Sequence, residues 1–133
     1  MANILIKADS KYPVNRKRIR ALVTDVLVTK GLKSEAIVSI SIVGNRKMTK
    51  LHEDYKKEVG TTDVLSFPYS TLDKTALTPG FITPENEGLM LGDIVVSYPE
   101  ARRQAREKNK MVDDQIDFLI EHGLNHLMGI HHD

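Results

Sequence analysis

The sequence predicts a single α+β domain, α/β-like in its alternation, that spans residues 1–133 and packs a small mixed four-stranded sheet with about four helices. Segments with the two-residue period of strands alternate along the chain with segments that have the 3.6-residue period of helices. No linker, repeat or low-complexity tract interrupts them. With 133 residues, of which 41% are hydrophobic, the chain can bury one core without disulfides.

The first half of the chain is predicted to contain two strands and two helices. Residues 3–8 form the first strand, and a helix follows at 16–30, because apolar residues recur on one face and Gly31 ends it. Residues 37–43 alternate apolar residues with serines, which is typical of a strand with one buried face. A shorter helix is then indicated by the spacing of Met48, Leu51 and Tyr55.

The second half is predicted to contain two more strands, at 63–67 and 90–96, and two helices. The polar stretch 70–88 between these strands is long for a connection in a compact domain, so we expect it to act as a flap over a site. Pro99 opens the first of the two helices, and the last helix closes the chain.

Four of the five histidines lie in the last twelve residues. His122 and His126 are one helical turn apart, so both imidazoles project from the same face and can bind one ion. Gly129 follows where a helix commonly ends in a left-handed residue, which lets the chain turn back and brings His131 or His132 to the same ion. The spacing H-x-x-x-H-x-x-G-x-x-H selects His132, and His131 is expected to point elsewhere.

Three nitrogen ligands leave a fourth position for water, which is typical of a catalytic zinc site. The chain has no cysteine, so histidine, carboxylate or water must hold the metal, and nickel or iron would also suit such a site. Each ligating histidine is expected to donate its other ring N–H to a carbonyl or carboxylate. Asp63 and Asp93 are the candidates for that role.

The common zinc peptidases have a glutamate directly after the first histidine as general base, and this chain has Gly123 there. Glu121 precedes His122 but points about 100° away on a helix. Without an adjacent base, the site must rely on the metal to lower the pKa of bound water and to polarise the electrophile. That strategy suits phosphodiester cleavage, in which positive charge stabilises the phosphate oxygens.

The net charge of +1 gives no global argument for nucleic acid, but three local basic clusters are either solvated helix faces or a phosphate-binding track. The first cluster consists of Lys11 and the basic residues between Arg16 and Arg20. The second consists of Arg46, Lys47, Lys50, Lys56 and Lys57, and the third of Arg102, Arg103, Arg106, Lys108 and Lys110. No stretch has the form of a signal peptide or the ~18 apolar residues of a membrane span. A cytoplasmic protein without a membrane partner is therefore expected.

The histidine block from His122 to His132 resembles the signature of the YbeY-type endoribonucleases, zinc-dependent proteins of bacterial ribosomal RNA maturation. The segments Thr62-Asp-Val-Leu-Ser-Phe67 and Leu91-Gly-Asp-Ile94 agree with that family in order and spacing, and the likeness runs from about Leu51 to the C-terminus. The resemblance implies that His122, His126 and His132 bind one zinc ion. It also implies that the strand at 62–67 borders the catalytic cleft.

The chain departs from the family pattern at several positions. The arginine that usually follows Tyr55 is here Lys56, which keeps the positive charge but loses the planar, bidentate fork. We expect Lys56 to be a catalytic residue that binds the RNA phosphate, with Arg46, Lys47 and Lys50 extending the basic surface. The other departures are His131 in place of an aspartate, with Asp133 beyond the third histidine, Asn125 in place of an apolar residue, and Gly60-Thr61 in place of a proline.

The resemblance implies a single-strand-specific, metal-dependent endoribonuclease, a hydrolase in which zinc-activated water attacks an RNA phosphodiester during ribosomal RNA processing and ribosome quality control. Its partners would be ribosomal RNA and the ribosomal subunit or assembly factors. Two alternatives stay open. A non-catalytic, zinc-stabilised ribosome-assembly module is favoured by Lys56, and a metzincin-like zinc peptidase is favoured by the histidine spacing but opposed by Gly123.

Overall fold

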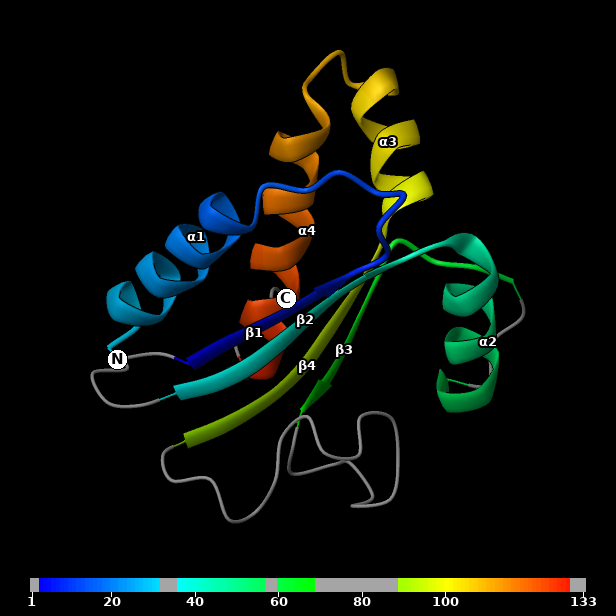
Figure 1. Ribbon diagram of the computed structural model, residues 1–133. Coiled ribbons are helices and arrows are strands. Elements are labelled where there is room, and N and C mark those ends of the chain that lie inside the picture. The colour runs from blue at the N-terminus through cyan, green and yellow to red at the C-terminus, as the bar shows by residue number, and fades with distance from the viewer. Residues whose placement is uncertain (1–2, 32–35, 57–59, 69–88, 130–133) are drawn as a thin grey trace.

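The computed structural model describes residues 3–31, 36–56, 60–68 and 89–129, and it confirms the predicted α+β class (Figure 1). The strands differ from their predicted bounds by one residue at most, and the predicted flap at 70–88 lies outside the described residues. The elements are β1 (Asn3–Ala8), α1 (Arg16–Thr29), β2 (Ala36–Val43), α2 (Asn45–Lys56), β3 (Val64–Pro68), β4 (Leu89–Ser97), α3 (Tyr98–Glu107) and α4 (Val112–Leu127). Among the described helices, none is long and apolar enough to span a membrane.

The four strands form one mixed sheet in the order β1-β2-β4-β3. β1, β2 and β4 run parallel, and β3 pairs antiparallel with β4 at the edge. The register shifts within β4, because Ile37 of β2 pairs with Met90 whereas Val38 pairs with Gly92. One extra residue in β4 is therefore bulged out of the ladder, and Gly92 beside it has a φ of +140°, which favours glycine.

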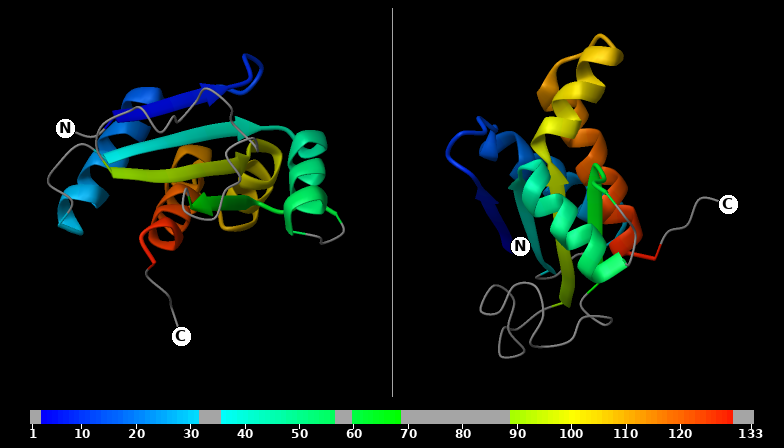
Figure 2. Two further views of the ribbon diagram at one scale, coloured as in Figure 1. Left: turned by 90° about the horizontal axis from the view of Figure 1, so that it is seen from below. Right: turned by 90° about the vertical axis from the view of Figure 1, so that its right-hand side faces the viewer.

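Helices cover both faces of the sheet (Figures 1 and 2). Ile94 and Val96 of β4 join the larger core under α1, α3 and α4, whereas Val95 between them joins a smaller core under α2. This alternation follows from the two-residue period of a strand. Among the described helices, α2 therefore lies alone on the face opposite α4, the helix that carries His122 and His126.

Two glycines let α4 lie close to the sheet. Gly123 faces Ile94, where an added Cβ would lie 2.9 Å from the Ile94 Cγ2 atom. An added Cβ at Gly92 would lie 3.0 Å from the Leu127 Cδ2 atom of α4 and 2.2 Å from the Phe67 carbonyl oxygen. The C-terminal half of α4 is thus held against β3 and β4 at contacts that leave no room for a side chain.

A partly buried polar network ties the N-terminal half of α4 to its neighbours. Gln115 of α4 is fully buried, and its Nε2 donates to the Gln104 Oε1 of α3 at 2.6 Å. Gln104 in turn donates to the Asp63 Oδ2 at 3.0 Å, at the start of β3. Hydrogen bonds between buried groups are costly to leave unmade, so this network fixes how α3, α4 and β3 meet.

Arg18 joins α1 to α4 through two carboxylates. Its Nη2 lies 2.6 Å from the Asp114 Oδ1, and its Nε lies 2.7 Å from the Asp117 Oδ2. The bond from Arg18 lowers the pKa of Asp114. Burial raises the pKa of the Asp117 carboxyl, and the bond from Arg18 only partly offsets this.

We expect Arg18→Ala to raise the pKa of both Asp114 and Asp117, because it removes the hydrogen bonds that lower them. Carboxyl carbon NMR titration would measure both shifts. Since the folded pKa of Asp114 lies below its unfolded value of about 3.9, its stabilising contribution is present above that pH and is lost as the pH falls through the folded pKa. Identical titrations in the variant and the wild type would contradict this assignment.

Candidate metal centre

The candidate site is a pair of histidines on the exposed side of α4. The Nε2 atoms of His122 and His126 lie 3.2 Å apart, and their ring centroids are 4.6 Å apart. Both side chains are exposed, while the opposite side of α4 is buried against the core. The structure thus brings together two of the three predicted ligands on one exposed side of α4, as the helical spacing indicated.

The geometry of the pair fits one metal ion. Two nitrogens bound to one tetrahedral zinc at about 2.0 to 2.1 Å lie roughly 3.3 to 3.4 Å apart. The Nε2 atoms of His122 and His126 are already within about 0.2 Å of that separation. A hydrogen bond between one protonated and one unprotonated ring has a similar length, and in either state the two nitrogens converge on one point.

The third predicted ligand, His132, and its neighbour His131 lie outside the described residues. Among the residues that the structure does describe, no group of three or more histidine, cysteine or acidic side chains could hold a metal ion. α4 ends at Leu127, and Gly129 has a φ of +74°, which confirms the left-handed turn predicted after the helix. The chain therefore changes direction before His131 and His132, and the choice between them stays a prediction.

Lys56 lies at the end of α2, on the other side of β3 from α4. Its ammonium group is 5.5 Å from the ring centroid of Phe67, and Tyr55 makes an edge contact with that ring at 6.0 Å. Phe67 belongs to the core under α2, whereas its carbonyl oxygen lies against Gly92 below α4. The edge strand β3 therefore lies between α2, which carries Lys56, and α4, which carries the histidine pair (Figure 2, right).

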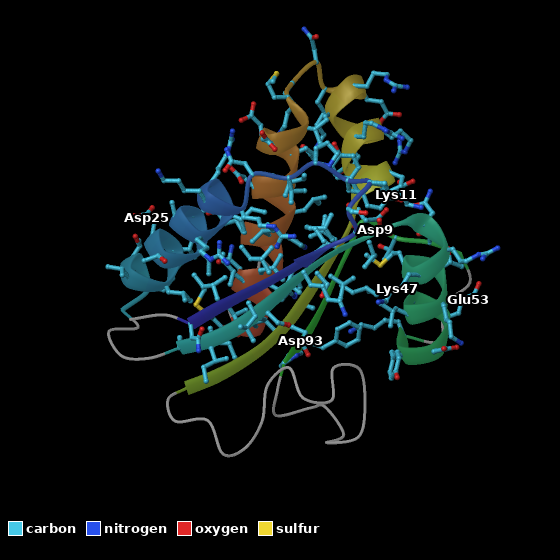
Figure 3. The ribbon with its side chains drawn as sticks, viewed as in Figure 1. Asp9, Lys11, Asp25, Lys47, Glu53 and Asp93 are labelled. Carbon is cyan, nitrogen blue, oxygen red and sulfur yellow. The ribbon has the colours of Figure 1, made fainter. Side chains whose placement is uncertain are left out.

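The predicted hydrogen-bond partners of the histidines are engaged elsewhere. Asp63 accepts from Gln104 and from its neighbour Val64, whose N–H lies 2.7 Å from Oδ1. Asp93 is buried in β4 and accepts a hydrogen bond from the Ser39 hydroxyl of β2 (Figure 3). Because Gly92 faces α4, the next residue along the strand points to the opposite face. The spacing of these aspartates along the chain gave no sign of which face they occupy.

The other lysines and arginines of α2 have separate surroundings. Lys50 forms an ion pair with Asp54 at 3.1 Å. Lys47 lines a cavity of about 220 Å³ beside Lys7 and Asp9, where β1 and β2 end (Figure 3). Both are surface side chains, and the described contacts join neither of them to the histidine pair.

The contribution of Gly92 and Gly123 is the part of the site that sequence reasoning missed. The sequence pattern places Gly123 in the apolar stripe of the last helix, in the position of a peptidase glutamate, and it marks Gly92 only as part of a motif. A glycine inside a strand often marks a bulge or a close approach, and one inside a helix usually has a packing reason. That signal would have indicated that α4 and β4 touch at these two positions.

The fold and the site together define a small mixed α+β domain whose last helix presents paired histidines beside an edge strand. Residues 5–133 match the family described as "Endoribonuclease YbeY". The chain therefore belongs to the YbeY family. This membership supports an endoribonuclease, which is a hydrolase with RNA as its substrate.

Individual relatives agree with this assignment. A protein named Endoribonuclease YbeY from Thermobifida fusca is 33% identical over 130 residues, which cover 98% of this chain and 81% of the relative. Another of the same name, from Anaeromyxobacter sp., is 32% identical over 131 residues, and the match spans 96% of this chain but only 62% of the relative's length. The solution structure of TM1509 from Thermotoga maritima shares the fold, with a TM-score of 0.60 at 20% identity over 98% of this chain and 75% of that one.

Proposed function

We propose that this chain is a single-strand-specific, metal-dependent endoribonuclease that acts in ribosomal RNA processing and ribosome quality control in the cytoplasm. His122, His126 and His132 would hold one zinc ion. The observation that carries the proposal is the convergence of the His122 and His126 Nε2 atoms, 3.2 Å apart, in a chain of the YbeY family. Ribosomal RNA, with the ribosomal subunit or assembly factors, would be its partner.

When bound, the metal would supply a Lewis acid that lowers the pKa of water and offsets charge on phosphate. The chain's own residues supply the rest. The buried face and close glycine contacts of α4 hold the helix that carries the two imidazoles against the sheet. Lys56, on the other side of β3, would bind another phosphate of the same RNA strand and so help to hold that strand at the site.

The packing of Gly123 opposes the peptidase alternative. A glutamate there would place its Cβ 2.9 Å from Ile94 Cγ2, so that either the buried Ile94 side chain or the helix would have to shift. The zinc-peptidase base would therefore disturb the way α4 packs on the sheet. The non-catalytic alternative is favoured by one observation, the position of the Lys56 ammonium above the Phe67 ring rather than beside the histidines.

Cleavage assays with single-stranded RNA, double-stranded RNA and casein, each with zinc and with a chelator, test the proposal. We expect that only single-stranded RNA is cleaved, and that it is cleaved with zinc but not with the chelator. Binding of RNA without cleavage at any metal concentration would support the non-catalytic module. Cleavage of casein would contradict the argument drawn from Gly123.

Lys56→Ala is expected to slow RNA cleavage and to flatten the salt dependence of RNA binding. Each phosphate contact on a single strand adds about 0.7 to the slope with which the logarithm of the binding constant falls against the logarithm of salt concentration. Lys56→Arg should preserve or raise activity, since it restores the bidentate fork. Zinc content should not change in either variant. The matched control is Lys30→Ala, which removes an exposed lysine just after α1 that belongs to none of the three basic clusters. A wild-type salt slope and rate in Lys56→Ala would show that this lysine is only surface charge.

A further inference from the structure

Phe118 is a large aromatic side chain on the outer side of α4. It is 53% exposed, although most of its helix neighbours with apolar side chains are buried. A single exposed apolar residue is common on protein surfaces and needs no function by itself. The groups around this ring and its place on the helix distinguish it from such a residue.

Two ammonium groups flank the ring. The Nζ atoms of Lys108 and Lys110 lie 5.1 and 5.4 Å from its centroid, within the range of cation–π contacts. Both lysines belong to the turn between α3 and α4. That turn is fixed by the left-handed Asn109, with a φ of +54°, and by the Lys110 N–H, which donates to the Ala105 carbonyl at 2.9 Å. The fold therefore holds two cations beside an exposed aromatic ring.

The ring also lies on the same side of α4 as the histidine pair. Phe118, His122 and His126 follow at intervals of four residues, so each is rotated by only about 40° from the one before. Along the axis the ring precedes the two histidines by about 6 and 12 Å. The acidic residues Asp114 and Asp117 turn instead towards Arg18 of α1, which pairs with both carboxylates.

An exposed aromatic ring, flanked by cations and aligned with a hydrolytic site, matches the way proteins bind single-stranded nucleic acid. Bases of any sequence stack on aromatic side chains while nearby lysines bind the backbone. Successive nucleotides of a stacked strand rise by about 3.4 Å along its axis. The distance from Phe118 to the histidine pair therefore corresponds to roughly two to four nucleotides.

We propose that Phe118 is a stacking platform for one base of single-stranded RNA, and that Lys108 and Lys110 bind the phosphates on either side of that base. The platform lies roughly two to four nucleotides from the RNA phosphodiester that would be cleaved at the histidine pair. It explains how the strand is oriented along α4, and this inference rests on the proposed endoribonuclease function.

The test is fluorescence anisotropy with a labelled twelve-nucleotide oligo(A) and the full-length protein, with the integrity of the RNA checked on a gel. Phe118→Ala should weaken binding by roughly 5- to 100-fold, the range that one lost stacking contact produces. Phe118→Leu keeps an apolar side chain and should be similarly weak, whereas Phe118→Trp should restore affinity to about that of the wild type. Lys108→Ala and Lys110→Ala should each reduce the salt slope by about 0.7.

Val28→Ala, which alters an exposed apolar residue of α1, is the matched control and should bind RNA as the wild type does. If the wild type binds RNA and Phe118→Ala binds it equally well, the platform does not exist. The endoribonuclease proposal would still stand in that case. A protein partner would then be the better occupant of this surface. If the wild type does not bind RNA, both proposals fail. Equal losses in Phe118→Ala and Phe118→Trp would also overturn the stacking role, because the ring would then be needed only for its shape.

Discussion

His126→Ala is expected to remove the metal from the protein and to reduce RNA cleavage at least about 100-fold, since even the loss of a ligand's supporting partner costs 10- to 100-fold. His126 is one of the two proposed ligands whose Nε2 atoms already converge to 3.2 Å. Stability should fall too. A metal present at 100 times its Kd adds about 2.7 kcal/mol to the folded state, and that contribution disappears with the site.

Elemental analysis and thermal melting of proteins purified in parallel would measure these effects. The wild type should contain one metal ion per chain and should melt roughly 10 °C lower after chelation. His126→Ala should melt like the chelated wild type and should no longer respond to chelator. The matched control is His131→Ala, which we expect to keep its metal. Loss of metal in His131→Ala but not in His132→Ala would overturn the choice of third ligand.

Gly92→Ala should be among the most destabilising substitutions in the protein, by on the order of 4 kcal/mol. Its φ of +140° strains any residue with a Cβ, and the new Cβ would lie 2.2 Å from the Phe67 carbonyl oxygen, which is backbone and cannot move aside alone. Strain of about 1 to 3 kcal/mol and overpacking of similar size combine here. Because Leu127 of α4 also contacts this position, the end of the histidine helix should be displaced and metal affinity should fall.

Urea unfolding of Gly92→Ala and Gly31→Ala would separate the loss of stability caused by backbone strain from the loss caused by the collision of the new Cβ. Gly31 has a φ of +88° but nothing within 4 Å of an added Cβ, so its substitution by alanine imposes strain without a collision. We expect Gly31→Ala to cost about 1 kcal/mol. Equal losses in the two variants would show that the close contact between β3, β4 and α4 contributes nothing to stability.

Local patterns were enough to predict most of the fold. The alternation of Val38, Ile40 and Ile42 with serines indicated β2, and all three side chains enter the larger core. The helical spacing of His122 and His126 indicated one shared face, and the structure confirms it. Such features depend on residues within a few positions of one another, which is why one sequence reveals them.

Features that depend on how distant elements meet were not predicted. The bulge beside Gly92 arises from the pairing of β4 with β2, and its consequence appears at Leu127 of α4. Asp93 was a candidate partner for the histidines, but strand alternation combined with the bulge turns it towards Ser39. The separation of Lys56 from α4 likewise follows from α2 packing on the other face of the sheet. No local period encodes these relations.

The most direct measurement of the central claim is a metal titration followed by RNA cleavage. Protein stripped with a chelator is titrated with zinc, and cleavage of single-stranded RNA is recorded at each step for the wild type and for His122→Ala. We predict that cleavage is absent without metal and rises until one zinc per chain is bound, and that His122→Ala stays inactive throughout. Undiminished cleavage by the stripped wild type, or zinc-restored cleavage by His122→Ala, would contradict the account.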